Sequence, residues 1–277
     1  ITTSYLAALD LDEKLVGIEA KADTRELYKL AAPELPSLPN VGSLKQFNLE
    51  TCVSPEPDLV ILSAKVPDAV AKLEELGIPV IAVNPESEKE FKETISMIGI
   101  ACNVQERAGE LTESYDKAIA DLAAKLEGVV PARVYLGGNS AFLSTAGPAM
   151  FQDLLIRGAG AENVASEIAD AYWATVSYEQ LLAWNPDAII LAPQAEYTVD
   201  DVLNDPALAD LDAVKNGKVY AMPNVIESWD SPIPSSYLGS IWMASVLYPD
   251  AVSTEDYTKA CVDFYQQFYG FDASSVL

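Results

Sequence analysis

The sequence contains no histidine among its 277 residues. This removes the commonest general base, the Ser-His-Asp and Cys-His nucleophile systems, and the usual zinc or manganese ligand sets. Its three cysteines, Cys52, Cys102 and Cys261, show no CxxC spacing, which argues against a thiolate metal site or a redox pair. We interpret these thiols as small buried apolar groups rather than as partners in a disulfide.

Basic residues are also scarce. The chain has 17 basic and 42 acidic side chains, a net charge of −25. Nucleic-acid affinity comes mainly from clustered Lys and Arg, so this balance argues against a nucleic-acid partner and against docking on anionic lipid. Most of the carboxylates need no role beyond keeping the protein soluble. No apolar run reaches the roughly 18 residues that a membrane span needs.

Half of the residues are apolar, which is enough for a sizeable core. Thr2-Thr3-Ser4 is expected to cap a helix over 5–11, and short apolar runs then alternate with helical patterns. Strands are expected at 15–18, 58–62 and 78–83, with a helix at 68–76 between the last two. This rhythm predicts an α/β fold with a mainly parallel sheet covered by helices.

The rhythm breaks at about residue 90, where the sequence becomes helical as far as 126. A second α/β series follows, with strands at 133–136, 188–191 and 218–222 and final helices at 236–248 and 255–269. We therefore predict an N-terminal lobe at 1–100, a long linker helix at 101–127 and a C-terminal lobe at 128–277, with a ligand cleft between the lobes. Each lobe has a capped short helix, then Pro-Asp, then a buried strand, at 48–62 and at 177–191.

An ordered series of motifs resembles a known family over nearly the whole chain. Leu38-Pro39-Asn40-Val41-Gly42 and Pro57-Asp58-Leu59-Val60-Ile61 resemble the first lobe of the helical-backbone (class III) substrate-binding proteins of ABC importers, which include iron-siderophore-, haem- and vitamin B12-binding proteins. The second lobe agrees at 145–164, 176–187, 216–220 and 264–270. The family's usual first strand and turn are absent here, so we expect the mature protein to begin upstream of Ile1.

Ligands of open parallel sheets lie beyond the carboxyl ends of the strands, which selects the loops that face a ligand. Residues 1–100 hold 9 basic and 17 acidic side chains, and residues 128–277 hold 5 basic and 19 acidic. The basic residues expected on ligand-facing loops all belong to the first lobe. An anionic ligand would therefore be held by that lobe, where the candidates are Thr3, Lys21, Arg25, Lys45 and Lys65.

The second lobe offers aromatic and neutral polar candidates instead. Tyr172, Trp173 and Trp229 lie on loops and could form an apolar wall against a chelate ring, whereas Trp184 and Trp242 fit a core position on helices. Asn139 and Ser140 follow a Gly-Gly pair and could donate hydrogen bonds to the ligand.

The resemblance also implies a partner and a location. Carboxylates on the outer faces of such proteins dock on arginines of the membrane permease, and Asp68, Asp200 and Asp201 are the candidates. The protein would be an extracytoplasmic monomer, either periplasmic or lipid-anchored at the outer face of the cell membrane. We predict no cofactor and no resident metal.

The leading hypothesis is a solute receptor for an iron chelate of the siderophore type, with no bond made or broken. The alternatives on the same scaffold are haem, cobalamin or an oxyanion such as molybdate. Haem is disfavoured without histidine, since only a tyrosine such as Tyr172 could be its axial ligand. An enzyme is disfavoured because the sequence has no phosphate loop and no GxSxG elbow. An adhesion module would require a large aromatic patch outside the cleft.

Overall fold

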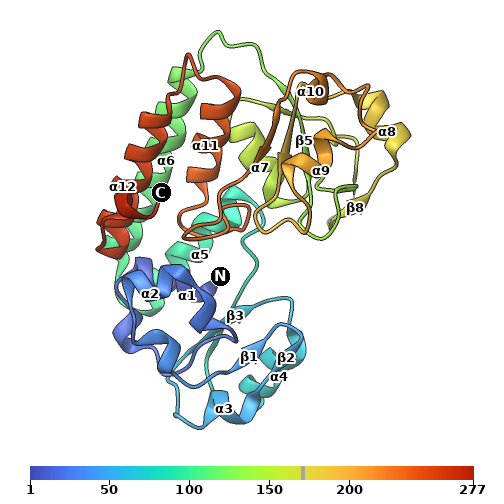
Figure 1. The fold of residues 1–277 in the computed structure, drawn as a ribbon. Coiled ribbons are helices and arrows are strands. Elements are labelled where there is room, and N and C mark those ends of the chain that lie inside the picture. The colour runs from blue at the N-terminus through green and yellow to red at the C-terminus, as the bar shows by residue number, and fades with distance from the viewer. Residues whose placement is uncertain (170–171) are drawn as a thin grey trace. The chain divides into compact units, whose positions relative to one another are not determined.

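A computed structural model describes residues 1–169 and 172–277 (Figure 1). The chain divides into two compact units, residues 1–114 with 262–277 and residues 115–261. The first unit holds a parallel strand pair and the second a four-stranded parallel sheet, each accompanied by helices. The α/β prediction is therefore confirmed. The division differs from the predicted boundaries, because it falls inside the long helix and groups the end of the chain with the first unit.

The first unit is built around strands β3 (Val60–Ser63) and β4 (Val80–Val83), which run parallel with Val60 opposite Val80. Between them lies α4 (Pro67–Glu75), as the sequence predicts. The other elements are α1 (Thr2–Ala8), α2 (Glu26–Ala31), the hairpin β1 (Gly42–Ser43) and β2 (Gln46–Phe47), α3 (Leu49–Val53), α5 (Glu88–Ala101) and the start of α6 (Gln105–Lys125), with short 3-10 turns at Asp12–Lys14, Ala22–Thr24, Leu35–Ser37 and Ala273–Ser275.

Two local predictions for this unit are wrong. The helix begins at Thr2, so Thr3 and Ser4 are buried in its first turn instead of capping it. The run 15–18 makes only one β-bridge, between Ile18 and Asn40. Val16 is 43% exposed, so this run lacks the continuous burial of a central strand.

The second unit contains a sheet in the order β10-β9-β5-β7, all parallel, from β5 (Arg133–Gly137), β7 (Glu162–Asn163), β9 (Ala188–Leu191) and β10 (Val219–Ala221). The small pair β6 (Ser144–Thr145) and β8 (Ala174–Thr175) is antiparallel. The helices are the rest of α6, α7 (Phe151–Gly158), α8 (Tyr178–Trp184), α9 (Val199–Leu203), α10 (Asp212–Lys215), α11 (Tyr237–Leu247) and the start of α12 (Thr254–Tyr269), whose end belongs to the first unit.

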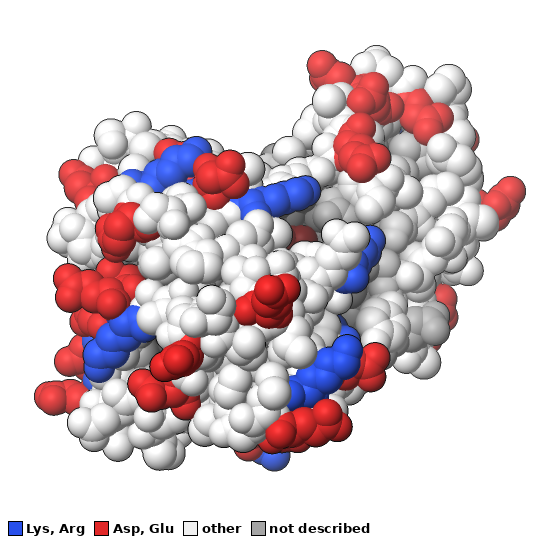
Figure 2. Space-filling view, turned by 90° about the horizontal axis from the view of Figure 1, so that it is seen from below, with Lys and Arg blue, Asp and Glu red and all other residues white. Residues whose placement is uncertain are grey.

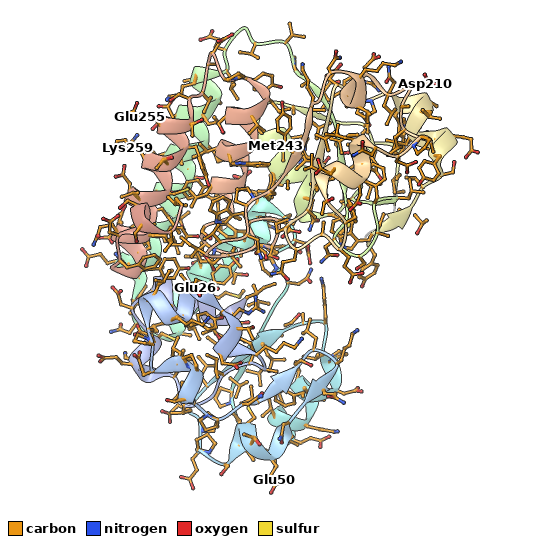
Figure 3. All side chains as sticks on the ribbon, in the orientation of Figure 1. Glu26, Glu50, Asp210, Met243, Glu255 and Lys259 are labelled. Carbon is orange, nitrogen blue, oxygen red and sulfur yellow. The ribbon has the colours of Figure 1, made fainter. Side chains whose placement is uncertain are left out.

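Burial in the second unit follows the predicted strands and helices. All four residues of β9 are buried, as expected for a strand covered on both faces. Helix α11 is buried along most of its length and packs beside α7 (Figure 1). In Figure 3, Met243 on α11 lies in the interior, whereas Asp210 and Glu255 point outward.

The two capped helices that the sequence predicts are both present. The Asn48 side chain accepts a hydrogen bond from the backbone N–H of Thr51 at the start of α3, and Ser177 accepts one from Gln180 at the start of α8. Such caps satisfy N–H groups that have no partner within the helix. Each helix leads into a parallel strand, β3 or β9, so the same local unit occurs once in each half of the chain.

Candidate functional site

In each unit the parallel strands end at the same edge of the sheet, where a ligand is expected to bind. In the second unit the sheet register aligns Gly137 of β5 with Leu191 of β9, and Leu191 with Ala221 of β10. The loops that follow these three strands therefore start at the same level of the sheet. We call them the carboxyl edge of the second unit, residues 138–143, 192–198 and 222–235.

Three of the predicted cations of the first unit are accessible. Lys21, Arg25 and Lys45 are exposed, and Lys45 lies in the turn of the β1–β2 hairpin. Lys21 has a φ of +64°, a left-handed conformation that non-glycine residues adopt at a cost. Figure 2 shows basic side chains lying among more numerous acidic ones on one face of the surface.

Lys65 is different, because its charge is already matched. Its Nζ lies 2.5 Å from Oε1 of Glu86 in a partly exposed ion pair. The pair joins the loop after β3 to the loop after β4. A ligand would have to compete with Glu86 for this cation, which argues against the predicted role of Lys65 as a main anion contact.

Thr3 belongs to a small hydrogen-bonded cluster around Glu19. The Thr3 hydroxyl donates to Oε2 of Glu19 at 2.6 Å, and the Tyr28 hydroxyl donates to Oε1 at 2.6 Å. Burial, together with the nearby Glu19 carboxylate, raises the pKa of the Tyr28 phenol well above its ordinary value, so Tyr28 keeps its proton. Thr3 is only 6% exposed, and its hydroxyl already donates its hydrogen bond to Glu19. This arrangement argues against Thr3 as a ligand donor.

Sequence reasoning missed Glu19 and Tyr28. Neither residue belongs to a motif or to an apolar stripe, and they come together through tertiary contacts over 16 and 9 residues. The only sequence signal was that Glu19 begins a loop expected to face a ligand.

At the carboxyl edge of the second unit, Asn139 and Ser140 are exposed, and the Ser140 hydroxyl donates to Oδ1 of Asn139 at 3.2 Å. Trp173 is half-buried and lies against Gly138, where an added Cβ would come within 2.9 Å of the indole ring. The Tyr197 hydroxyl donates to the Gly138 carbonyl at 2.7 Å. The Gly-Gly pair therefore allows a close approach of an aromatic ring to the backbone.

The predicted aromatic wall is only partly present. Tyr172 is 70% exposed, but Trp229 is 2% exposed and meets the ring of Tyr257 edge-on, with centroids 5.9 Å apart. Its Cβ also lies close to Gly239 of α11. The prediction that Trp229 lines a ligand site is wrong in this structure, because its apolar area is used in the core. Trp184 and Trp242 are buried, as predicted.

The candidate docking carboxylates have different surroundings. Asp68 is exposed in the first turn of α4, and Asp200 is exposed in the first turn of α9. Asp201 completes a capping box, accepting hydrogen bonds from the backbone N–H and the hydroxyl of Thr198, both at 2.8 Å. These hydrogen bonds lower the pKa of Asp201 and commit its carboxylate to the helix end.

Within residues 1–169 and 172–277, no three His, Cys, Asp or Glu side chains are grouped so that they could hold a metal ion. Cys52, Cys102 and Cys261 are free thiols; Cys52 and Cys261 are buried, as the sequence interpretation expects, whereas Cys102 is only partly buried. In the same part of the chain no helix is both long and apolar enough to cross a membrane.

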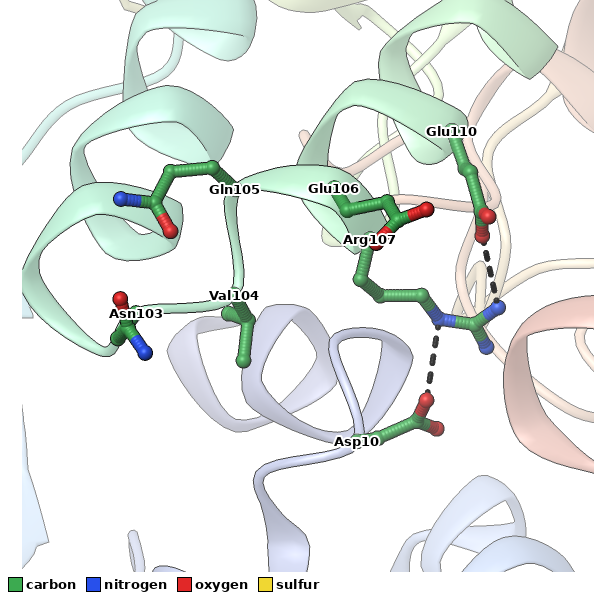
Figure 4. Close-up of a pocket in the computed structure, with 7 residues that line it drawn as sticks. All are labelled: Asp10, Asn103, Val104, Gln105, Glu106, Arg107 and Glu110. Atoms are coloured by element: carbon green, nitrogen blue, oxygen red, sulfur yellow. Dashed lines mark hydrogen bonds and ion pairs between the residues drawn. The ribbon is translucent and has the colours of Figure 1, made fainter.

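A pocket of about 590 Å³ lies in the first unit, between the ends of α1 and α5 and the start of α6 (Figure 4). Arg107 lines it together with Asp10, Glu110 and four neighbours, and none of these is a predicted ligand residue. The Arg107 guanidinium donates to the carbonyl oxygens of Ala8 at 3.1 Å and Gln267 at 2.8 Å, and lies 4.8 Å from the ring centroid of Phe268. These contacts make Arg107 a structural link between α1, α6 and α12.

We expect Arg107→Met to lower the stability of the first unit by about 2 kcal/mol, because two backbone acceptors lose a charged donor and the cation–π contact is lost. Urea unfolding followed by circular dichroism measures this. The control is Lys89→Met on α5 of the same unit, since the Lys89 side chain is 82% exposed and forms a surface ion pair with Glu93. Surface pairs of this kind contribute at most about 1 kcal/mol. Equal effects of the two substitutions would contradict the structural role of Arg107.

Comparison with known proteins places the chain in a family. The model of the periplasmic binding protein family matches residues 2–226. The chain is 28% identical over 295 residues to the molybdate-binding protein MolA of Haemophilus influenzae, covering 97% of this chain and 83% of that protein. It is 30% identical over 170 residues to a vitamin B12-binding protein of Salmonella choleraesuis, covering 61% of this chain and 64% of that protein.

The fold agrees with this assignment. The solved structure of MolA bound to molybdate superimposes with a TM-score of 0.83 at 26% identity, covering 98% of this chain and 90% of that one. The family model alone spans well over half of the sequence. The chain therefore belongs to the periplasmic binding protein family, the class III substrate-binding proteins of ABC importers, which bind a solute outside the cytoplasm and are not enzymes.

Proposed function

We propose that the protein binds a small oxygen-rich anion, of which molybdate is the leading example, and delivers it to an ABC permease. The observation that carries this proposal is that Lys21, Arg25 and Lys45, three cations expected on ligand-facing loops of the first unit, are exposed in a chain of net charge −25. Against so negative a background, accessible cations on loops that precede or flank the strands are the groups that would favour an anion.

Similarity to a molybdate-binding protein over 97% of this chain supports the oxyanion. The structure also weakens the main argument for a large chelate, because Trp229 is buried and leaves the expected aromatic wall incomplete. Neutral donors such as Asn139 and Ser140 suit the oxygens of a compact anion.

A ferric chelate of the siderophore type is the second candidate. Tyr172 is 70% exposed and Trp173 is half-buried at the carboxyl edge of the second unit, so some aromatic surface is available to an organic scaffold. Exposed Asp68 and Asp200 are the carboxylates we propose for docking on the permease, acting from a monomeric receptor.

Isothermal titration of the full chain with sodium molybdate, a ferric siderophore, haem and cobalamin tests the ligand class. We expect heat from molybdate, and we expect the affinity to fall as the salt concentration rises, because exposed cations are screened. Heat from haem or cobalamin alone would contradict the proposal, and heat from the ferric siderophore alone would favour the second candidate.

Replacing Lys21, Arg25 and Lys45 together by glutamine should weaken molybdate binding by about tenfold or more, since three attractive charges are lost. The matched control replaces Lys29, Lys72 and Lys89, which are exposed on helices of the same unit, so the net charge changes equally. Titration calorimetry at low salt compares the two triple variants. Similar losses in both would mean that only the overall charge matters and would contradict the assigned contacts.

A further inference from the structure

Three polar side chains at the carboxyl edge of the second unit form a network that joins two loops. The Gln194 side-chain amide donates to Oδ1 of Asn224 and to Oγ of Ser228, each at 3.3 Å. The Ser228 hydroxyl donates to the same Oδ1 of Asn224 at 2.7 Å. Gln194 follows β9, whereas Asn224 and Ser228 follow β10, its neighbour in the sheet.

In this network only the Asn224 side chain has N–H donors that are not used within the network. Both amide protons of Gln194 and the proton of Ser228 are directed within the network. Oδ1 of Asn224 receives two of these bonds, which fixes the orientation of its amide. The two protons on Nδ2 of Asn224 then point away from the network, and Asn224 is exposed.

The backbone at Gln194 supports a functional interpretation of the network. Its φ is +60°, a left-handed conformation that costs a glutamine free energy and that the surrounding structure must maintain. Glycine would adopt this conformation without strain. The glutamine side chain at this position is what reaches both Asn224 and Ser228.

The neighbouring loop is tied to the same edge. The backbone N–H of Glu196 donates to the Asn139 carbonyl at 2.9 Å, and that of Ala192 donates to the Gly137 carbonyl at 2.9 Å. The three loops that form this edge contain no lysine or arginine in the sequence. The same loops carry three carboxylates, Glu196, Glu227 and Asp230, so contacts of this edge with an anion must come from its neutral donors and aromatic rings.

We infer that Asn224 donates hydrogen bonds from Nδ2 to the acceptor oxygens of the transported anion, and that Gln194 and Ser228 hold its amide in the donating orientation. The inference rests on the proposed function and adds the second unit's polar contact to it. The acceptor oxygens can belong to a free oxyanion or to the carboxylate and catecholate groups around a chelated metal.

The test compares Asn224→Asp with Asn216→Asp by titration calorimetry with sodium molybdate and with ferric citrate. Asn216 is also exposed, but it lies before β10, at the opposite end of that strand, and its substitution adds the same charge. We expect Asn224→Asp to weaken binding by about tenfold or more, because two donors are replaced by a repelling carboxylate. Asn216→Asp should change the affinity by less than about twofold.

The positioning role of Gln194 needs a separate measurement. Gln194→Ala should weaken binding in the wild-type background and have no further effect in the Asn224→Ser background, since coupled residues show non-additive effects. The ratio of the two affinities distinguishes the two sources of acceptor oxygens. Tighter binding of molybdate indicates a free oxyanion, and tighter binding of ferric citrate indicates the oxygens around a chelated metal. Thermal unfolding of each variant checks that the second unit remains folded.

The outcomes are distinct. Wild-type binding combined with equal affinities of the Asn224 and Asn216 variants overturns the inference and leaves the proposed function standing. Fully additive effects of Gln194→Ala overturn the positioning role. Failure of the wild type to bind either probe overturns the proposed function, and the inference with it.

Discussion

Replacing Asp230 by asparagine is expected to stabilise the second unit at neutral pH by about 3 kcal/mol. Asp230 is 7% exposed, and burial raises the pKa of its carboxyl to about 6, although a hydrogen bond from its own backbone N–H acts in the opposite direction. The neutral amide removes the cost of holding a buried negative charge above that pH. The backbone carbonyl of Asp230 still accepts from the Gln152 side chain, at 2.9 Å, in the variant.

The pH dependence follows from the same shift. In the unfolded chain the Asp230 carboxyl has its ordinary pKa of 3.8, whereas in the folded state burial raises this pKa to about 6. Between these two pKa values the unfolded state binds fewer protons than the folded state. The contribution of Asp230 to the stability of the fold therefore falls as the pH rises. Below the lower value the contribution is complete, and above about pH 6 it is lost.

Urea unfolding at several pH values between 4 and 8 measures this effect. The difference in stability between Asp230→Asn and the wild type should be small near pH 4 and grow to its full size above pH 6. Asp210→Asn is the control, because the Asp210 side chain is 93% exposed. A variant that is less stable than the wild type at pH 7 would show that the charged form is favoured in the native protein.

A second large effect is expected at Asn163, in the stretch 145–164 of the second lobe that resembles the family. Its side chain donates to the Ala146 carbonyl at 2.9 Å and to Oδ1 of Asp153 at 3.0 Å, and accepts from the backbone N–H of Ala165 at 2.9 Å. Asp153 is itself buried, and its other oxygen accepts from Arg157 at 2.7 Å. Asn163 therefore joins β7, α7 and the loop after β6.

Asn163→Leu should destabilise the second unit by about 3 kcal/mol or more, because a buried carboxylate, a carbonyl and an N–H each lose a partner. A loss of this size is a large part of the about 5–15 kcal/mol by which domains are usually stable. Chemical denaturation of the variant measures it, with Asn216→Leu as the exposed control. A loss no greater than that of the control would mean that the three groups find other partners.

Local patterns predicted most of the elements that surround these sites. The structure matches the predicted strands at 58–62, 133–136 and 188–191 and the long helices to within a few residues. These elements are predictable because apolar runs and helical spacing are visible in the local sequence. The prediction at 15–18 was wrong because a short apolar run carries little information about whether a neighbouring strand will cover it.

The candidate site was predictable only as a set of loops. Lys21, Arg25, Lys45, Asn139 and Ser140 were predicted from the expected strand ends, and all are exposed. The run 15–18, which was expected to lead into the loop of Lys21 and Arg25, is not a strand in the structure. Trp229 was misassigned because a loop tryptophan can turn inward, and here it packs beside Tyr257. The ion pair between Lys65 and Glu86 could not be predicted, because the two residues are 21 positions apart and meet only where the loops after β3 and β4 come together.

The absence of histidine and the scarcity of cations are set by the sequence alone. They argue against the Ser-His-Asp and Cys-His nucleophile systems, the usual zinc or manganese ligand sets and a nucleic-acid partner. The α/β rhythm and the family motifs were likewise present in the order of residues. Tertiary structure decided which polar groups meet: Glu19 with Thr3 and Tyr28, and Gln194 with Asn224. Such contacts depend on strand order and register, and no local periodicity contains that information.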